Sequence, residues 1–238
     1  MMRTGIFILI ASCLTIKANA QNKTYFGLEF SVANDVFKIT DTGDYLKPVP
    51  LYNAQGGIFI RQELGLHVFI ESGVILKAYN DGFGFRTIPY YGVGSSDISW
   101  LLPLRIGLRA NLLKERLWFV PVGGYTFGIN PPFGYGLGYG TQRSTTTTIS
   151  YSSTENPDVS RYFSLFQIGA GLEVQLFKVL LCTLSTSYYT GINNTMQLDI
   201  IYTVNNSAPY SGTAISKGGF WCATIELRYP ISNFWTKD

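Results

Sequence analysis

The sequence predicts an all-β protein, a transmembrane antiparallel up-and-down β-barrel of about eight strands. Apolar and polar residues alternate with a period of two along most of the chain. Beyond Gln21, no run approaches the 18 or more apolar residues that a transmembrane helix needs. Charged residues make up 14% and aromatic residues 15% of the chain, whereas charged residues supply about 25% of a typical soluble domain.

The N-terminus is typical of an export signal. Arg3 gives a positive start, Ile6 to Ile16 are mostly apolar, and Ala18-Asn19-Ala20 fits a cleavage site. We therefore expect a signal peptide over 1–20 and an outer-membrane β-barrel domain over 21–238. Two alternatives stay open, a buried first helix and a lipoprotein signal ending at Cys13.

The clearest strand runs from Leu102 to Leu112. Six apolar residues at alternate positions share one face, and Arg105 and Arg109 lie on the other. Six such positions span about eleven residues, the length of a tilted membrane strand. The other candidates are Phe26–Val32, Tyr52–Ile60, Leu66–Lys77, Leu117–Phe127, Tyr162–Phe177, Val179–Tyr189 and Trp221–Tyr229, and in Leu117–Phe127 and Val179–Tyr189 the two faces stay unassigned.

The connections alternate in length, as in outer-membrane barrels with short periplasmic turns and long outer loops. The expected turns are Arg61–Leu64, Leu113–Glu115 and Phe177–Lys178. The expected loops are Ala33–Leu51, Asn80–Ser96, Ile129–Ser160 and Gly191–Ala214. Aromatic residues near the strand ends, Trp100, Trp118 and Trp221 among them, predict two aromatic girdles.

Two segments carry a family resemblance. Ile98–Leu108 and the following Trp118-Phe119-Val120-Pro121-Val122-Gly123-Gly124-Tyr125 resemble strands of the PorT-like, or outer-membrane β-barrel, family of Bacteroidota. The resemblance implies a small eight-stranded barrel in the cell outer membrane. One branch of that family is linked to type IX protein secretion.

Charged residues on the inward faces predict a lumen filled with ion pairs. The expected lumen charge network is Glu29, Glu71, Lys77, Arg105, Arg109, Glu173, Glu226 and Arg228, because unpaired buried charges are costly. A gated polar path or ligand site is the alternative. We expect no catalytic residue, metal or cofactor. The only histidine, His67, lies near a periplasmic turn, and a disulfide between Cys182 and Cys222 stays open.

The loop over 129–160 contains the candidate binding residues Phe133, Tyr135 and Tyr139. The alternatives for this segment are an adaptable surface loop and strands that extend above the membrane as a ribbon. We expect a monomeric, non-enzymatic barrel that contacts outer-membrane lipid and has a structural or protein-interacting role, with partners in a secretion or envelope complex. Lys and Arg are scattered, so no nucleic acid partner is expected. The alternatives are a receptor or adhesin that binds an extracellular ligand through its long loops and, third, a membrane-embedded enzyme.

Overall fold

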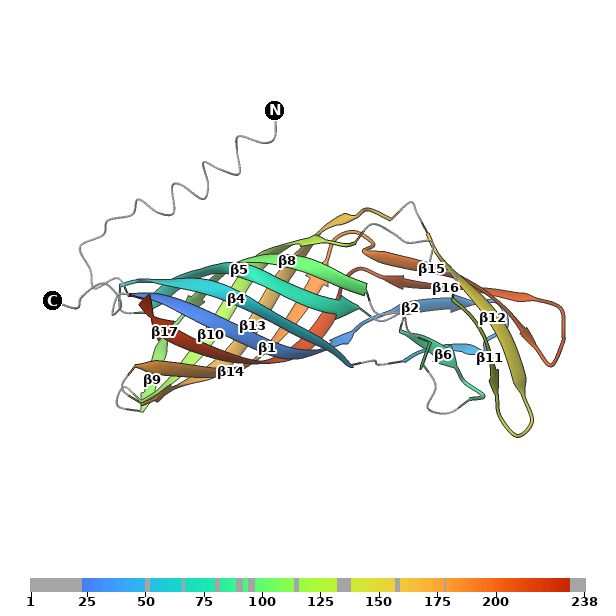
Figure 1. Cartoon of the computed structure of the whole chain (residues 1–238), viewed down its shortest axis with the longest axis horizontal. Coiled ribbons are helices and arrows are strands. Elements are labelled where there is room, and N and C mark those ends of the chain that lie inside the picture. The colour runs from blue at the N-terminus through green and yellow to red at the C-terminus, as the bar shows by residue number, and fades with distance from the viewer. Residues whose placement is uncertain are drawn as a thin grey trace, which may run out of the picture.

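The structure is a computed structural model. It describes residues 23–231 except 50–51, 66, 80–81, 89–91, 94–96, 114–115, 132–137, 157–158 and 178. The predicted signal peptide lies outside these residues, as do Phe133 and Tyr135. No helix within the described ranges is long and apolar enough to cross a membrane. The strands form a barrel and, at one end of it, two smaller sheets (Figure 1).

Eight strands close into an antiparallel barrel, as the sequence predicts. In ring order they are β1 (Thr24–Asp35), β4 (Tyr52–Leu64), β5 (Val68–Tyr79), β8 (Asp97–Leu108), β10 (Leu117–Ile129), β13 (Tyr162–Leu176), β14 (Leu180–Gly191) and β17 (Phe220–Pro230). The pairing of β17 with β1 closes the ring. β9 (Ala110–Leu113) continues the line of β8 along β10.

The register gives the barrel its tilt. Paired residues can be followed once around the ring from Thr24 back to β1, and the path runs Thr24, Gln62, Ile70, Ile106, Gly123, Ile168, Tyr188, Trp221 and Asn34. The path returns ten residues beyond its start, at Asn34 rather than Thr24. A stagger of this size goes with strands tilted by about 35–45°.

The outer surface of the barrel is apolar and its interior is polar. Ile106, Ile168 and Leu184 expose 57%, 71% and 62% of their surface on the outside, whereas Glu29, Arg105 and other charged residues are buried inside. An apolar belt this extensive is covered by lipid in a membrane protein and would be a liability in water. The predicted faces of β8 and β13 are therefore confirmed.

Two details differ from the sequence prediction. The first turn is not Arg61–Leu64, because β4 continues through Leu64 and the turn contains Gly65, with a positive φ of 81°, and His67. Trp118 is not a girdle residue. It is buried inside the barrel, where its ring stacks under the Arg109 guanidinium at 3.8 Å.

The long connections, predicted as loops, fold into an outer module of two sheets. One sheet has the order β11-β12-β15-β16-β2, with β11 Gly138–Arg143, β12 Thr148–Glu155, β15 Met196–Val204, β16 Tyr210–Ser216 and β2 Lys38–Asp41. The other comprises β3 (Leu46–Pro48), β6 (Phe83–Phe85) and β7 (Gly92–Val93). The module lies at the end of the barrel opposite the start of β1 and the end of β17 (Figure 1).

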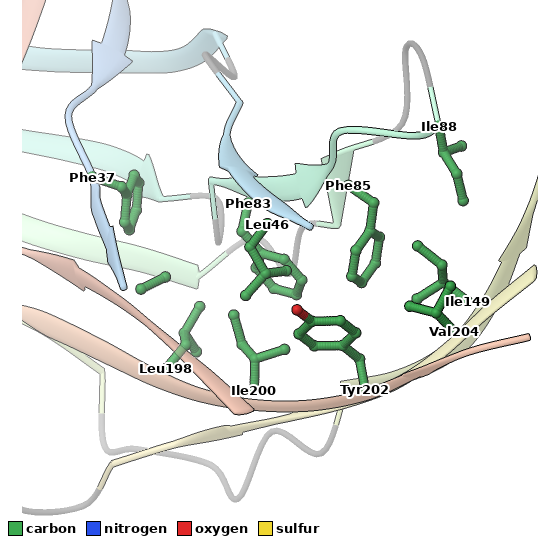
Figure 2. Close-up of a cluster of buried hydrophobic side chains, with 11 residues drawn as sticks. Phe37, Leu46, Phe83, Phe85, Ile88, Ile149, Leu198, Ile200, Tyr202 and Val204 are labelled. Atoms are coloured by element: carbon green, nitrogen blue, oxygen red, sulfur yellow. The ribbon is translucent and has the colours of Figure 1, made fainter. Parts of the chain in front are cut away.

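A hydrophobic core joins the two sheets of the outer module. Phe83 and Phe85 of the smaller sheet pack against Ile200, Tyr202 and neighbouring residues of the larger one (Figure 2). The rings of Phe85 and Tyr202 lie 5.6 Å apart, at an edge-to-face angle of 63°, which is a favourable aromatic geometry. These segments therefore form a packed unit with its own core.

Asp41 anchors one corner of this core. Its carboxylate accepts hydrogen bonds from the backbone N–H groups of Gly43 and Leu46 and from the Tyr202 hydroxyl, at 3.0, 2.7 and 2.6 Å. Burial acts to raise the pKa of Asp41, but these hydrogen bonds outweigh it and hold the pKa below its ordinary value of 3.8. Burial and the neighbouring Asp41 carboxylate raise the pKa of the Tyr202 phenol.

Asn130 joins the module to the barrel. Its side-chain amide donates to the Thr195 carbonyl just before β15, at 2.9 Å, and its side-chain oxygen accepts from Ser99 of β8, at 2.6 Å. Its backbone N–H donates to Arg161 O and its carbonyl accepts from Arg161 Nε, both at 2.9 Å. Barrel and module are therefore tied by a buried polar junction.

Candidate functional site

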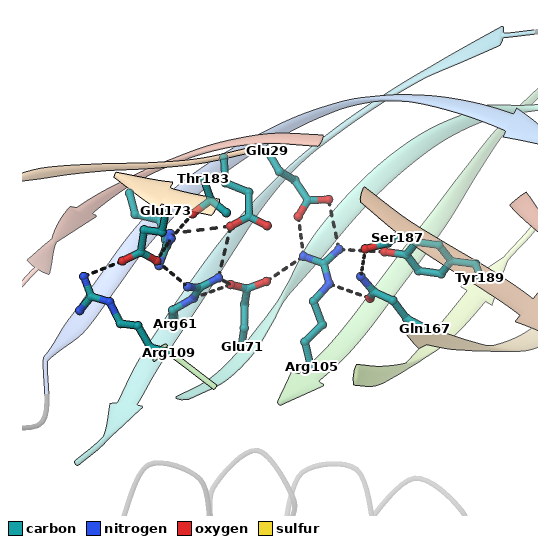
Figure 3. Close-up of polar contacts among 12 residues, drawn as sticks. Glu29, Arg61, Glu71, Arg105, Arg109, Gln167, Glu173, Thr183, Ser187 and Tyr189 are labelled. Carbon is teal, nitrogen blue, oxygen red and sulfur yellow. Dashed lines mark hydrogen bonds and ion pairs between the residues drawn. The ribbon is translucent and has the colours of Figure 1, made fainter. Parts of the chain in front are cut away.

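Arg105 is the centre of the charge network in the lumen (Figure 3). Its guanidinium donates to Glu29 at 2.6 Å, to Glu71 at 2.7 Å, to Gln167 at 3.0 Å and to Tyr189 Oη at 3.2 Å. These partners come from β1, β5, β13 and β14, so one side chain bridges the ring from several sides.

A second group of ion pairs lies on the periplasmic side of Arg105. Arg61 contacts Glu71 at 2.7 Å and Glu226 at 3.2 Å. Glu173 is held by Arg228 and by Arg109, the latter at 2.6 Å. Arg228 also donates to the Thr183 hydroxyl.

A third ionic contact lies at the outer end of the lumen. Lys77 is fully buried and pairs with Asp35 at 2.6 Å, and Asp35 also accepts a hydrogen bond from Asn53. The Lys77 ammonium lies 4.7 Å from the centre of the Phe220 ring. Lys77, a predicted member of the network, is thus separate from the Arg105 group.

All eight residues of the predicted network make ion pairs inside the barrel, and three more residues join them. The sequence reasoning missed Arg61, Asp35 and Glu63, the last of which pairs with Arg109 at 3.2 Å. Arg61 was assigned to a turn and Asp35 to a loop, although both continue their strands. The predicted balance of four against four becomes six acidic and five basic residues among the described ion pairs of the lumen.

Three lumen carboxylates, Glu29, Glu71 and Glu226, lie close enough for their oxygens to fall within 4.8 Å of one another. Oxygen clusters of this kind suit hard cations. Here the three carboxylates pair with two arginines. Arg61 contacts Glu71 and Glu226, and Arg105 contacts Glu29 and Glu71. The arrangement is therefore that of an ion-pair network.

The lumen is filled along its length. Tyr25, Phe69 and Trp118 cluster on the periplasmic side, and Phe163, Tyr189 and Phe220 cluster on the outer side. Between them lies a cavity of about 20 Å³ lined by Arg61, Glu71, Arg105 and neighbouring residues, which is room for roughly one or two water molecules. Among the described residues, the charge network and the two aromatic clusters therefore fill the interior on both sides of this cavity.

Glycines make this filling possible. A Cβ atom on Gly27 would overlap the ring of Phe59, and one on Gly107 would overlap the ring of Phe69. Both phenylalanines are buried inside the barrel. The inward glycines therefore give space to bulky neighbours, as expected for a narrow eight-stranded lumen.

The cysteines and the histidine lie outside any reactive cluster of the described residues. Cys182 pairs with Leu227 and Cys222 with Ser187, which sets the two cysteines five residues apart along neighbouring strands. That is about 16 Å, too far for a disulfide, and both thiols are free. His67 is exposed in the β4–β5 turn, where Nδ1 lies 3.2 Å from the Arg109 carbonyl oxygen.

The larger sheet of the outer module leaves one face open to solvent. A row across this face consists of Tyr139, Ser152, Ile201 and Ser211 on four neighbouring strands. Tyr139 exposes 83% and Ile201 57% of its surface. Ser and Thr dominate the rest of the face, with Thr141 and Ser150 hydroxyls 3.2 Å apart. Of the predicted loop residues, the structure describes only Tyr139.

A closed eight-stranded antiparallel barrel with an apolar outer belt and a buried charge network is the architecture of an outer-membrane β-barrel. The chain is similar in structure to the outer membrane protein OprG of Pseudomonas aeruginosa, with 7% identity, a TM-score of 0.44, and 87% of this chain and 96% of that one covered.

Two further similar structures are the outer membrane protein AlkL in lipid bilayers and the N-terminal β-barrel domain of P. aeruginosa OprF. AlkL has 12% identity, a TM-score of 0.43 and coverage of 90% and 93%. The OprF domain has 10% identity, a TM-score of 0.38 and coverage of 86% and 97%. No family model matches the sequence, and neither does any curated protein. Membership of the PorT-like family therefore stays a prediction.

Proposed function

We propose that this protein is a non-enzymatic membrane anchor that holds a binding module outside the cell, and that the module binds a protein partner. The observation that carries the proposal is the packed core of the outer module. Ordering four long segments costs conformational entropy, and anchoring the barrel in lipid does not require it. A rigid outer sheet instead provides a preorganised surface.

The open sheet face has the composition of a binding surface. Tyr139 and Ile201 are large exposed side chains, and the hydroxyls of Ser150, Ser152 and Thr141 surround them. Tyrosine gives rigid contact area at a low entropy cost, and serine gives adaptable hydrogen bonds, a combination that is common in protein-binding sites. A receptor or adhesin role fits this face better than a purely structural role does.

The filled lumen supports binding at the surface over transport. With aromatic clusters on both sides of the Arg105 group, a solute would have to break buried ion pairs to pass. A role in type IX secretion, implied by the family resemblance, stays a prediction. It would be supported if the captured partner were a secretion component.

Site-specific crosslinking from living cells tests the proposal. A photoreactive residue at Ser152, in the middle of the open face, should give a discrete crosslinked species, and Tyr139→Ser with Ile201→Ser should reduce it. The same residue at Arg86, which is exposed in the turn directly after β6, is the matched control. Equal labelling from both positions, or steady ion conductance of the purified protein in a planar bilayer, would overturn the proposal.

A further inference from the structure

Two exposed lysines, Lys38 and Lys217, come from neighbouring segments where the barrel meets the outer module. Lys38 is the first residue of β2 and pairs with Ile215 of β16. Lys217 follows two residues after Ile215, and the alternation of burial puts it on the same side as Ile215. If the register of β2 and β16 is extended from Ile215 to Lys217, just past the end of β16, Lys38 and Lys217 become diagonal neighbours, about 7–8 Å apart.

The pair lies directly above the aromatic girdle. Val36 donates its N–H to Gly219 O, and Trp221, two residues further along β17, exposes 56% of its surface toward lipid. The rings of Trp221 and Tyr188 lie 4.7 Å apart. Tryptophan and tyrosine rings sit at the headgroup level of a membrane. Lys217 lies four residues before Trp221, and Lys38 lies four residues after Asn34, the partner of Trp221. Their long side chains can therefore reach back toward the phosphates.

The two charges have no protein counter-charge in the described part of the chain. No described carboxylate forms an ion pair with Lys38 or Lys217, and the nearest acid on that face, Asp199, faces Thr213 across the sheet. Neighbouring like charges on a sheet destabilise it. An anion bound between the two lysines would remove that repulsion.

We propose that Lys38 and Lys217 together bind a phosphate group of a phosphorylated glycolipid in the outer leaflet. The exposed Val36 offers apolar surface to the aliphatic stems, while the ammonium groups reach the phosphate, as lysines do at membrane interfaces. The site continues the lipid-covered belt of the barrel and is complementary in charge to anionic headgroups. It rests on the placement of the barrel in the outer membrane and does not require the proposed protein partner.

Binding of lipid A to the full chain in a neutral detergent tests the site. A basic residue near a membrane surface strengthens anion binding about fivefold, so Lys38→Gln with Lys217→Gln should weaken binding about thirtyfold. The Lys→Arg double variant should restore binding, and Arg143→Gln, which removes one positive charge elsewhere on the module, should leave it unchanged. Heat-modifiable gel migration confirms that each variant is folded.

Three results would overturn the proposal. One is equal binding by the wild type and the Gln double variant, and another is equal binding of lipid A and its dephosphorylated form. The third is displacement of lipid A by millimolar inorganic phosphate, which would indicate a free-phosphate site. If the double variant does not fold, the salt dependence of lipid A binding to the wild type tests the proposal instead. Binding through two charges must weaken as salt screens them, so binding that does not change with salt would overturn the proposal.

Discussion

Replacing Arg105 by Met should destabilise the barrel more than almost any other single change. The substitution removes donors to Glu29, Glu71, Gln167 and Tyr189 at once. Glu71 keeps Arg61 as a partner, but Glu29 has no other ion pair among the described residues. Removing one partner of a buried ion pair costs about 3–5 kcal/mol, because the remaining charge stays buried without compensation.

The double variant Arg105→Met with Glu29→Gln separates this cause from lost packing. If the main cost is the unpaired buried carboxylate of Glu29, adding Glu29→Gln should recover about 2 kcal/mol of the lost unfolding free energy, as coupled pairs do in double-mutant cycles. Stability is measured by urea unfolding from lipid vesicles, with tryptophan fluorescence and gel migration as readouts. Arg143→Met, on the exposed face, should change stability by less than about 0.5 kcal/mol.

Two outcomes would refute the reasoning. One is an Arg105→Met protein within about 0.5 kcal/mol of the wild type, since the lumen would then solvate Glu29 well. The other is a double variant whose loss equals the sum of the two single losses, since the two side chains would then not be coupled.

Three further predictions concern the lumen and the outer module. Gly107→Ala should cost about 1–3 kcal/mol in the same urea assay because its methyl overlaps Phe69, whereas Gly123→Ala, which meets only a backbone oxygen at 3.8 Å, should be neutral. Phe85→Ala should cost the module about 3–5 kcal/mol and expose it to protease while the barrel keeps its gel migration. The Asp41 pKa is lowered on folding, so its contribution is complete above pH 3.8 and is lost as the pH falls through the folded value. Protease sensitivity of the module should therefore rise below about pH 4, and Asp41→Asn should remove that dependence.

The barrel could be predicted because a strand that faces lipid on one side and the lumen on the other alternates apolar and polar residues. In β8 the residues from Leu102 to Leu108 alternate without interruption, so both the strand and its faces follow from the sequence. In β10 the pattern is broken by Pro121 and by Gly123-Gly124, and the inward position of Trp118 was missed. Strand ends were the weakest part, which is why Arg61 and Asp35 were left out of the charge network.

The outer module was missed for a different reason. Leu198, Ile200, Tyr202 and Val204 alternate with polar positions and could have been recognised as a strand, although Ile201 obscures the pattern. Their packing partners, Phe83 and Phe85, come from a strand of only three residues more than 100 positions away in the chain. Short strands give weak periodicity, and nothing local indicates which distant segment covers them.

The ion-pair network of the barrel and the hydrophobic core of the outer module both make this protein rigid. In the barrel, ion pairs link β1, β4, β5, β8, β13 and β17 across the lumen. A shift of any one of these strands would leave a buried charge without its partner, at a cost of several kcal/mol. The Asn130 junction then fixes the module on this rigid base. A partner that binds the open sheet face therefore gains little by distorting the barrel, because its binding energy would have to exceed that cost. For the proposed function, the energetics of the lumen therefore favour display of a fixed surface over signalling through the barrel.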